Sequence, residues 1–367
     1  MRITFVLPSA NMRGGTRVIA IYAERLKQRG HQVTVVATPR RLPSLKMYVK
    51  SLLTRFQWPQ EQAIGPSHFD STSIKVKHID RVRPITNDDV PDADVVIATW
   101  WETAEWVQAM APAKGVKIHF MQDYEVFGGD PARVDATCRL RMPKIIIAQW
   151  VRALLKEKFN HEDITLVPNS VDPELFYAPP RGKQAAPAVG LTYTEFRNKG
   201  CDISIEAYQR AKKILPDLKL VCFASCRESE TMPLPAGTEF NYLVPDEGLK
   251  DIYARCDAWL FGTRVEGFGL PILEAMACRT PVIGTPAGAA PDLIGPGGGI
   301  LIPHENPQAM ADAIVKMCRM PDAEWRKMSD QAYRTATQYS WEDATDLFEA
   351  ALQQAVDRSR HGQFSAA

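Results

Sequence analysis

Short apolar runs alternate along the chain with longer stretches in which apolar residues recur every three or four positions. The runs have the length of buried strands, and the longer stretches have the period of helices that bury one face. In the first half we expect strands at 3–7, 32–37, 95–98, 116–121, 145–148 and 164–167. Strands that alternate with helices predict a parallel sheet covered on both faces.

A proline-rich segment, 168–188, interrupts this alternation, and we interpret it as an interdomain linker. The alternation then restarts, with strands expected at 189–192, 218–224, 258–262 and 281–284 and helices at 201–214, 246–255 and 270–278. Successive helices follow, the last of them N-capped by Ser340. We therefore predict an α/β protein with Rossmann-like domains at 1–180 and 188–340, followed at 341–367 by a C-terminal helix and a tail.

Composition narrows the class of protein. The chain has 367 residues and a formal net charge of +1, so no global field favours nucleic acid. Its 7 cysteines include no CxxC pair, which favours reduced thiols in a cytoplasmic protein. The first apolar run stops at Pro8, too early for a signal peptide, and no apolar run has the length of a spanning helix.

The most informative stretch is Glu266-Gly-Phe-Gly-Leu-Pro-Ile-Leu-Glu274. Its glycines let backbone N–H groups approach a ligand, and Pro271 suits the first turn of a helix. The free N–H groups and the dipole at that helix start favour an anion. Carboxylates on either side accept hydrogen bonds from hydroxyls. The pattern fits a diphosphate with a sugar at one end and a ribose at the other.

This stretch, followed by Pro281-Val-Ile-Gly-Thr, closely resembles the donor motif of the family 4 glycosyltransferases, which have the GT-B fold. The resemblance implies that the two domains face each other across a cleft and that the C-terminal helix at 341–367 returns to the first domain. The resemblance extends over almost the whole chain, including Leu249-Lys-Asp-Ile-Tyr-Ala-Arg-Cys-Asp and Val167-Pro-Asn-Ser-Val-Asp. It implies that Glu266 contacts the transferred sugar and Glu274 the ribose. It also implies backbone contacts to the diphosphate from Gly267, Phe268, Gly269 and Leu270.

Two basic residues follow the first strand of the second domain. In the family a basic pair here neutralises the leaving diphosphate, and the resemblance carries that role to Arg197 and Lys199. The sequence departs from the family pattern because Gly190 is followed by Leu191 and Thr192, where an arginine is usual. Arg197 is our candidate for its replacement, with ordinary surface charge as the alternative.

The first domain is expected to bind the acceptor. Gly14 and Gly15 follow its first strand and suggest a loop that approaches the diphosphate, although a tight turn explains them equally well. Gln122 and Asp123 occupy the place where many relatives have a His-Asp pair near the transferred sugar. The resemblance therefore implies a catalytic role for Asp123 and acceptor contacts for Gln122 and Glu125. His119, just upstream, is expected to face the core.

The Gln-Asp-Tyr-Glu run and Trp100-Trp101-Glu102-Thr103 resemble rhamnosyltransferases of bacterial surface-glycan assembly. The resemblance implies dTDP-rhamnose as one candidate donor. Trp100 and Trp101 are candidates for stacking on acceptor sugars, with core packing as the alternative.

Asp92-Ala-Asp94 matches the DxD pattern by which other glycosyltransferases hold a metal, but it precedes a strand instead of following one. We therefore predict transfer without a metal and with no cofactor beyond the nucleotide sugar. A different feature is the segment 40–56, in which basic and apolar residues interleave. It predicts either peripheral contact with the inner face of an anionic membrane or a helix on the domain surface.

These features predict a retaining hexosyltransferase that moves a sugar from a nucleoside diphosphate to a glycan or lipid-linked glycan in surface polysaccharide synthesis. Three alternatives stay open. An epimerase or hydrolase on the same fold would consume the donor without an acceptor. A nicotinamide oxidoreductase would need a GxGxxG fingerprint, which the first strand lacks. A sugar-nucleotide sensor would bind the donor without turnover.

Overall fold

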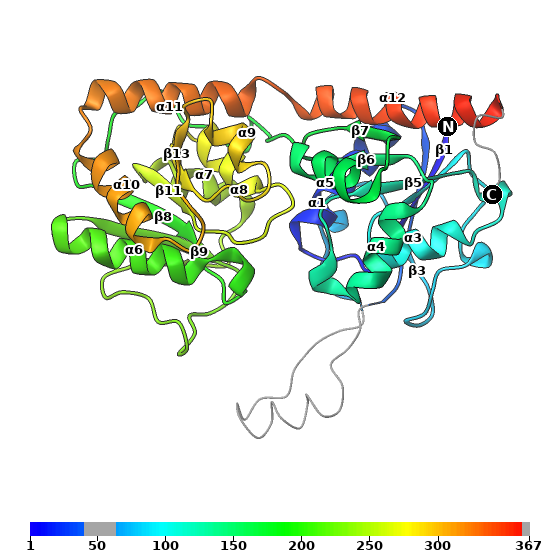
Figure 1. The fold of residues 1–367 in the computed structure, drawn as a ribbon, viewed down its shortest axis with the longest axis horizontal. Coiled ribbons are helices and arrows are strands. Elements are labelled where there is room, and N and C mark those ends of the chain that lie inside the picture. Colours follow the sequence, from blue (N-terminus) through cyan, green and yellow to red (C-terminus); the bar gives the residue numbers. More distant parts are fainter. Residues whose placement is uncertain (40–63, 362–367) are drawn as a thin grey trace. The chain divides into compact units, whose positions relative to one another are not determined.

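A computed structural model describes residues 1–39 and 64–361, which form two compact units (Figure 1). Unit 1 comprises Met1–Ile147, Val151–Val167 and Thr345–Ala367, and unit 2 comprises Ala148–Trp150 and Pro168–Ala344. Each has one all-parallel sheet in the described residues, with helices beside it. The predicted fold class is confirmed at this level.

Unit 1 has a sheet in the order β3-β2-β1-β4-β5-β6-β7. Its described strands are β1 Arg2–Leu7, β2 Gln32–Ala37, β3 Val76–His78, β4 Val95–Ala98, β5 Val116–Met121, β6 Lys144–Ile146 and β7 Ile164–Leu166. Its described helices are α1 Gly14–Gln28, α3 Trp101–Gln108, α4 Pro131–Arg139, most of α5 Gln149–Phe159 and most of α12 Trp341–Arg360. Short 3-10 turns are η1 His68–Ser71, η2 Asn87–Asp89, η3 Pro112–Lys114 and η4 Val126–Gly128.

Unit 2 has a sheet in the order β10-β9-β8-β11-β12-β13. The strands are β8 Ala188–Thr192, β9 Lys219–Ala224, β10 Glu239–Tyr242, β11 Ala258–Phe261, β12 Val282–Gly284 and β13 Gly299–Leu301. The helices are α6 Cys201–Ile214, α7 Asp246–Ala254, α8 Leu270–Ala277, α9 Ala290–Ile294, α10 Pro307–Arg319 and α11 Asp322–Thr337, with the 3-10 turn η5 Arg197–Lys199.

Both sheets reverse their strand order at one point, between β1 and β4 in unit 1 and between β8 and β11 in unit 2. In a parallel sheet the connections on either side of such a point leave toward opposite faces. The loops therefore diverge at the carboxyl ends of the two strands, where ligands of open α/β sheets bind. The fold thus marks one candidate edge in each unit.

The central strands match the sequence prediction because their side chains are apolar and buried. Every residue of β4 and β11 is buried. The structure adds β3, β10 and β13, which the sequence did not predict. All three lie at sheet edges and are only partly buried, so they lack the continuous apolar run of a central strand.

Residues 168–187 have no helix or strand and are tied to unit 2. The buried ring of Phe176 packs edge-on against Tyr253, with ring centroids 6.2 Å apart. The Arg181 guanidinium donates to the Thr280 hydroxyl at 2.9 Å and lies over the Trp325 ring. These contacts fix the segment on unit 2.

Helix α12 begins with the predicted capping box and packs in unit 1 from Thr345 onward. The Asp343 carboxylate accepts from the Ser340 backbone N–H at 2.8 Å, and the Ser340 hydroxyl accepts from the Asp343 N–H at 3.1 Å. Further along, the fully buried Phe348 ring stacks on Tyr22 with centroids 4.3 Å apart, and meets Phe120 edge-on at 5.1 Å. This aromatic cluster attaches α12 to unit 1.

We expect Phe348→Ala to lower the free energy of unfolding of unit 1 by about 3–5 kcal/mol, because the truncation leaves a cavity among rings that cannot collapse into it. Urea unfolding followed by circular dichroism measures the change. Leu347→Ala is the matched control, since that neighbouring side chain is 43% exposed. Equal losses in the two variants would contradict the assigned role of the cluster.

Three basic side chains are buried beside β5 and β6: His119, Lys144 and His161. His119 pairs in register with Lys144, as expected for a strand residue that faces the core. Burial lowers the pKa of His119 to about 3, and the nearby Lys144 and His161 charges add to the effect. Burial and the Lys144 charge lower the pKa of His161 to about 4.

These shifts predict acid sensitivity. Both histidines have a lower pKa in the folded chain than in the unfolded chain, so the unfolded chain binds more protons from about pH 6.5 down to about pH 3. Stability is therefore full above about pH 6.5 and falls as the pH decreases. At pH 4.5 we expect His119 alone to account for a loss of about 2–3 kcal/mol relative to pH 7. Urea unfolding at the two pH values should show a smaller loss for His119→Leu than for the wild type. His304→Gln, at an exposed position, should lose as much as the wild type.

Candidate functional site

The carboxyl edge of the unit 2 sheet gathers most of the predicted donor residues. β8 and β11 lie side by side, with Leu191 paired to Leu260. The loop after β8 carries Arg197 and Lys199, and the loop after β11 carries Glu266. Both loops therefore start from adjacent strands at the point where the strand order reverses.

The structure brings Lys199 and Glu266 together. The Lys199 Nζ lies 2.7 Å from Glu266 Oε2, and the Glu266 side chain is only 15% exposed. Arg197, the other predicted cation, has an exposed side chain, and its backbone carbonyl accepts a bond from Arg264. The cation that meets the predicted sugar-binding carboxylate is therefore Lys199.

The start of α8 supplies backbone N–H groups. Gly269 precedes the helix at φ +102, a left-handed conformation that favours glycine, and Pro271 lies in the first turn. This turn contains no acidic side chain to occupy the N–H groups. The Phe268 side chain is buried, so only its backbone is suited to meet a ligand. The predicted amide-rich helix start is thus present in the structure.

A further loop lies against this segment, and the sequence analysis missed it. The Ala289 N–H donates to the Phe268 carbonyl at 2.9 Å. Gly288 has φ +62, and a Cβ there would lie 2.7 Å from the Phe268 carbonyl oxygen and 3.0 Å from Glu266 Cγ. Only glycine fits this position. The available signal was the Thr-Pro-Ala-Gly run after the predicted strand 281–284.

Glu274 lies in α8 and is buried, with a relative exposure of 7%. The phenol of Tyr253, itself fully buried, donates to Glu274 Oε2 at 2.8 Å. The ring of Tyr253 packs against Trp259 on β11 with centroids 4.4 Å apart. The carboxylate is therefore oriented by a residue that is anchored in the core.

The carboxyl edge of the unit 1 sheet holds the predicted acceptor residues. Gly14 and Gly15 form the first turn of α1, which corrects the expectation that they lie in a loop before the helix. Because glycine has no side chain, the backbone at 14 and 15 is exposed in this turn. The Gln122 amide, after β5, donates to the Gly15 carbonyl at 3.1 Å and ties the two segments together.

The two adjacent tryptophans have different surroundings. Trp101 is 3% exposed, and Arg133 lies over its ring at 4.7 Å, so this ring packs in the core. Trp100 is partly exposed and meets Phe127 edge-on with centroids 5.9 Å apart. Phe127 is 54% exposed, and the sequence analysis did not select it. Of the two tryptophans, Trp100 is therefore the more accessible ring.

Glu125 is buried as well, and its carboxylate accepts from the Trp101 backbone N–H at 2.7 Å. Burial raises the pKa of Glu125 well above its usual value, and the Asp123 charge adds to the rise. Asp123 is partly exposed and accepts from the Tyr124 backbone N–H at 2.7 Å. Asp123 is therefore the more accessible of the two carboxylates.

The carboxylates of the DxD pattern have structural partners. Asp94 accepts from the Arg2 backbone N–H at 2.6 Å, and this bond is the first cause of its lowered pKa. Asp92 pairs with Lys114 at 2.9 Å. Across residues 1–39 and 64–361, no group of three or more His, Cys, Asp or Glu side chains has an arrangement that could hold a metal ion.

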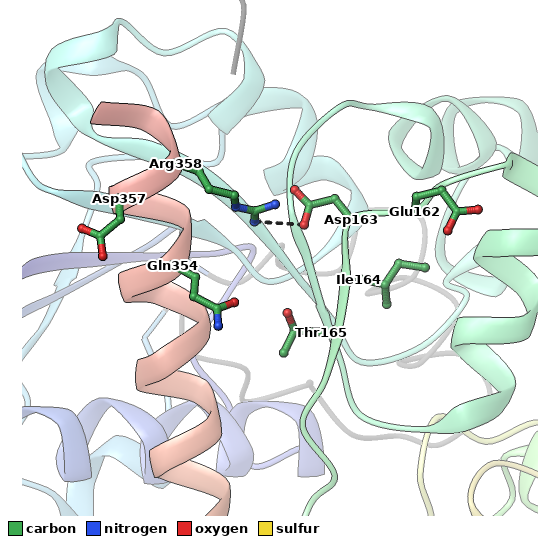
Figure 2. A pocket seen from close by; sticks show the side chains of 7 residues that line it. All are labelled: Glu162, Asp163, Ile164, Thr165, Gln354, Asp357 and Arg358. Atoms are coloured by element: carbon green, nitrogen blue, oxygen red, sulfur yellow. Dashed lines mark hydrogen bonds and ion pairs between the residues drawn. The ribbon is translucent and has the colours of Figure 1, made fainter. Parts of the chain in front are cut away.

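A hollow of about 410 Å³ lies in unit 1, beside β7 and the last turns of α12. Figure 2 shows the side chains that line it. The Asp163–Arg358 ion pair, 3.0 Å long, lies in its wall. The remaining lining residues are Glu162, Ile164, Thr165, Gln354 and Asp357. None of the candidate catalytic or binding residues predicted from the sequence lines this hollow, so we assign it no part in the chemistry.

Comparisons with known proteins bear on the second unit most directly. Residues 188–320 match the family described as glycosyl transferases group 1. The O-antigen chain mannosyltransferase B of Escherichia coli is 34% identical over 103 residues, 28% of this chain and 26% of that protein. The chain matches about a quarter to a half of the length of such curated relatives.

Solved structures extend the likeness to both units. HepE of Anabaena, in complex with UDP and glucose, has a TM-score of 0.70 at 16% identity, over 96% of this chain and 99% of that one. A glycosyltransferase from Rickettsia africae has a TM-score of 0.65 at 14% identity, over 97% and 98%. At this identity the likeness concerns the fold alone, which is the GT-B fold. The match over 188–320 agrees, for this part of the chain, with the resemblance to glycosyltransferases that the sequence motifs predicted.

Proposed function

We propose that the protein is a retaining glycosyltransferase that moves a sugar from a nucleoside diphosphate donor to an acceptor hydroxyl. The observation that carries the proposal is the Lys199–Glu266 pair, 2.7 Å long, beside the amide-rich start of α8. The pair joins a cation for the leaving diphosphate to a carboxylate for the sugar.

The diphosphate would bind at the start of α8. The first N–H groups of a helix have no intrahelical acceptor, and the helix dipole favours negative charge at that end. Gly267, Gly269 and Gly288 keep side chains away from this backbone. Lys199 supplies a positive charge that opposes the growing charge on the leaving phosphate.

Two carboxylates would hold the ends of the donor. Glu266 accepts from hydroxyls of the transferred sugar, and Glu274 accepts from the ribose. The two differ in support: Glu266 is held by a lysine in a loop, and Glu274 by a buried tyrosine. The diphosphate would compete with Glu266 for the Lys199 ammonium. When the diphosphate binds Lys199, the Glu266 carboxylate becomes available to the sugar hydroxyls.

Retention would follow from displacement on one face of the sugar. The bond from the anomeric carbon to the phosphate oxygen breaks, the acceptor oxygen bonds to the same carbon on the same face, and the acceptor proton passes to the departing phosphate. A nearby carboxylate such as Glu266 would stabilise the positive charge on the ring in this oxocarbenium-like state. No step of this scheme uses a metal ion.

The acceptor would be a glycan or a lipid-linked glycan of a surface polysaccharide. The relative from Escherichia coli is a mannosyltransferase by name, and the HepE structure contains UDP and glucose. These differ from the dTDP-rhamnose suggested by the sequence, so all three sugars belong among the donors to test. Within the described residues no helix combines the length and the apolar composition needed to cross a bilayer. The segment 40–56, which would supply peripheral membrane contact, lies outside the described residues.

A panel of UDP-glucose, GDP-mannose, ADP-glucose and dTDP-rhamnose would test donor binding. A donor that binds the native state raises the melting temperature. Turnover of that donor with and without a lipid-linked glycan fraction then separates transfer from hydrolysis or epimerisation. Acceptor-independent consumption at the full rate would replace the proposed function by one of those two activities.

For the donor so identified, we expect Glu266→Gln to lower kcat by roughly 100-fold or more, because the amide keeps the size of the side chain but loses the charge opposite the oxocarbenium-like state. The melting temperature should stay near the wild-type value. Glu324→Gln, exposed on α11, is the control and should leave kcat unchanged. Near-normal turnover of Glu266→Gln would remove Glu266 from the centre of the mechanism.

A further inference from the structure

Arg264 lies two residues before Glu266, in the loop that follows β11. Its guanidinium binds Asp202 in a bidentate manner, from Nη1 to Oδ1 and from Nη2 to Oδ2, each at 2.8 Å. Nη2 also donates to Glu305 Oε2 at 3.1 Å, and Nε donates to Glu305 Oε1. Nη1 donates in addition to the Arg197 carbonyl at 2.7 Å.

These contacts occupy the whole donor capacity of the side chain. A guanidinium has five N–H groups, and the five bonds to Asp202, Glu305 and the Arg197 carbonyl use one each. An arginine next to a predicted diphosphate site is the residue type expected to bind phosphate. Here no N–H group is left over for that purpose, so Arg264 has a different task.

The partners of Arg264 come from two other connections at the same edge of the sheet, so that Arg264 joins three connections in all. Arg197 is in η5 and Asp202 is in the first turn of α6, both after β8, whereas Glu305 lies between β13 and α10. The backbone strengthens the first link, because the N–H groups of Arg264 and Val265 donate to the Asn198 carbonyl at 2.8 and 3.3 Å. Asn198 is the neighbour of Lys199. Arg264 therefore holds the loop of Lys199 against the loop of Glu266.

The ion pairs of Arg264 with Asp202 and Glu305 contribute more to the placement of the loops than to the stability of the protein. The Arg264 side chain is 15% exposed, but those of Asp202 and Glu305 are 53% and 58% exposed. Ion pairs of such exposed carboxylates contribute little stability one by one. A planar fork with five bonds to two other connections nevertheless fixes both distance and orientation. The bonds from Arg264 also lower the pKa of Asp202 and of Glu305, which keeps both partners charged.

We propose that Arg264 is a positioning residue that sets the placement of Lys199 relative to Glu266. It acts through those two residues and does not itself contact the donor. The effect of Arg264 on turnover rests on the proposed function. Its role in holding the Lys199 loop against the Glu266 loop does not depend on any donor.

Hydrogen exchange of the full chain without donor tests the geometric claim. In Arg264→Met the amides of Arg264 and Val265 should exchange at least tenfold faster, because the loops that they join separate more often. The amide of Trp259, in the middle of β11, should keep its wild-type rate. Unchanged exchange at 196–200 and 263–268, or an equal rise throughout unit 2, would overturn the proposal.

Two further variants separate position from charge and from general stability. Arg264→Lys keeps the charge but loses the planar fork, so it should exchange nearly as fast as Arg264→Met. Restoration of wild-type exchange by lysine would reduce the role to charge and contradict the proposal. Arg210→Met is the matched control, because Arg210 also bonds to Glu206 and to Gln308, but on α6 and α10. It should leave exchange at 263–268 unchanged.

Activity provides the second readout, with the sugar nucleotide from the panel that the wild type turns over. Arg264→Met and Arg264→Lys should both lower kcat at least tenfold while the KM for the donor changes less than threefold, since misplaced Lys199 and Glu266 affect the transition state more than binding. A normal kcat in Arg264→Met would overturn the positioning role. If the wild type turns over none of the sugar nucleotides, the proposed function fails, whereas the exchange results still decide what Arg264 does.

Discussion

The pairing of β8 with β11 is the constraint on which the second unit depends. These strands are distant in sequence but adjacent in the sheet, and their packing fixes where the two loops of the site begin. Gly190 on β8 makes room for the Trp259 ring on β11, since a Cβ at Gly190 would lie 2.3 Å from that ring. Trp259 in turn packs against Tyr253, whose phenol holds Glu274. Core packing and site geometry are thus one continuous set of contacts.

The sequence predicted the parts of the fold that depend on continuous apolar patterns. Strands β2, β4 and β5 and helix α6 have the predicted limits, because each buries a regular apolar face. The edge strands β3, β10 and β13 escaped prediction, since one flank of an edge strand has no neighbouring strand and its residues need not be apolar. Gly14 and Gly15 were predicted in a loop because they lie between the first strand and the helical pattern that follows it, but the structure places them in the first turn of α1.

The candidate site was predictable where a local pattern encodes it and not where distant segments meet. Glu266, Glu274 and the glycines between them lie in one short run, so spacing alone pointed to them. Contacts of Arg264 with Asp202 and Glu305 join residues remote in sequence, and no local pattern predicts them. The different surroundings of Trp100 and Trp101 are also tertiary: adjacent identical residues give no sequence signal of which ring is buried.

Lys199 and Arg264 lie in neighbouring loops and have different roles, the first in contacting a ligand and the second in holding the loops together. Lys199 has a compact ammonium on a flexible stem, is 44% exposed, and pairs with a single carboxylate. An approaching diphosphate that draws it away from Glu266 breaks this single ion pair. Arg264 has a rigid fork, is mostly covered, and would have to leave two carboxylates and a carbonyl together. Loss of these partners would separate the three connections that Arg264 joins. The two residues have the same charge, but the number of their partners suits Lys199 to contact a ligand and Arg264 to hold the loops in place.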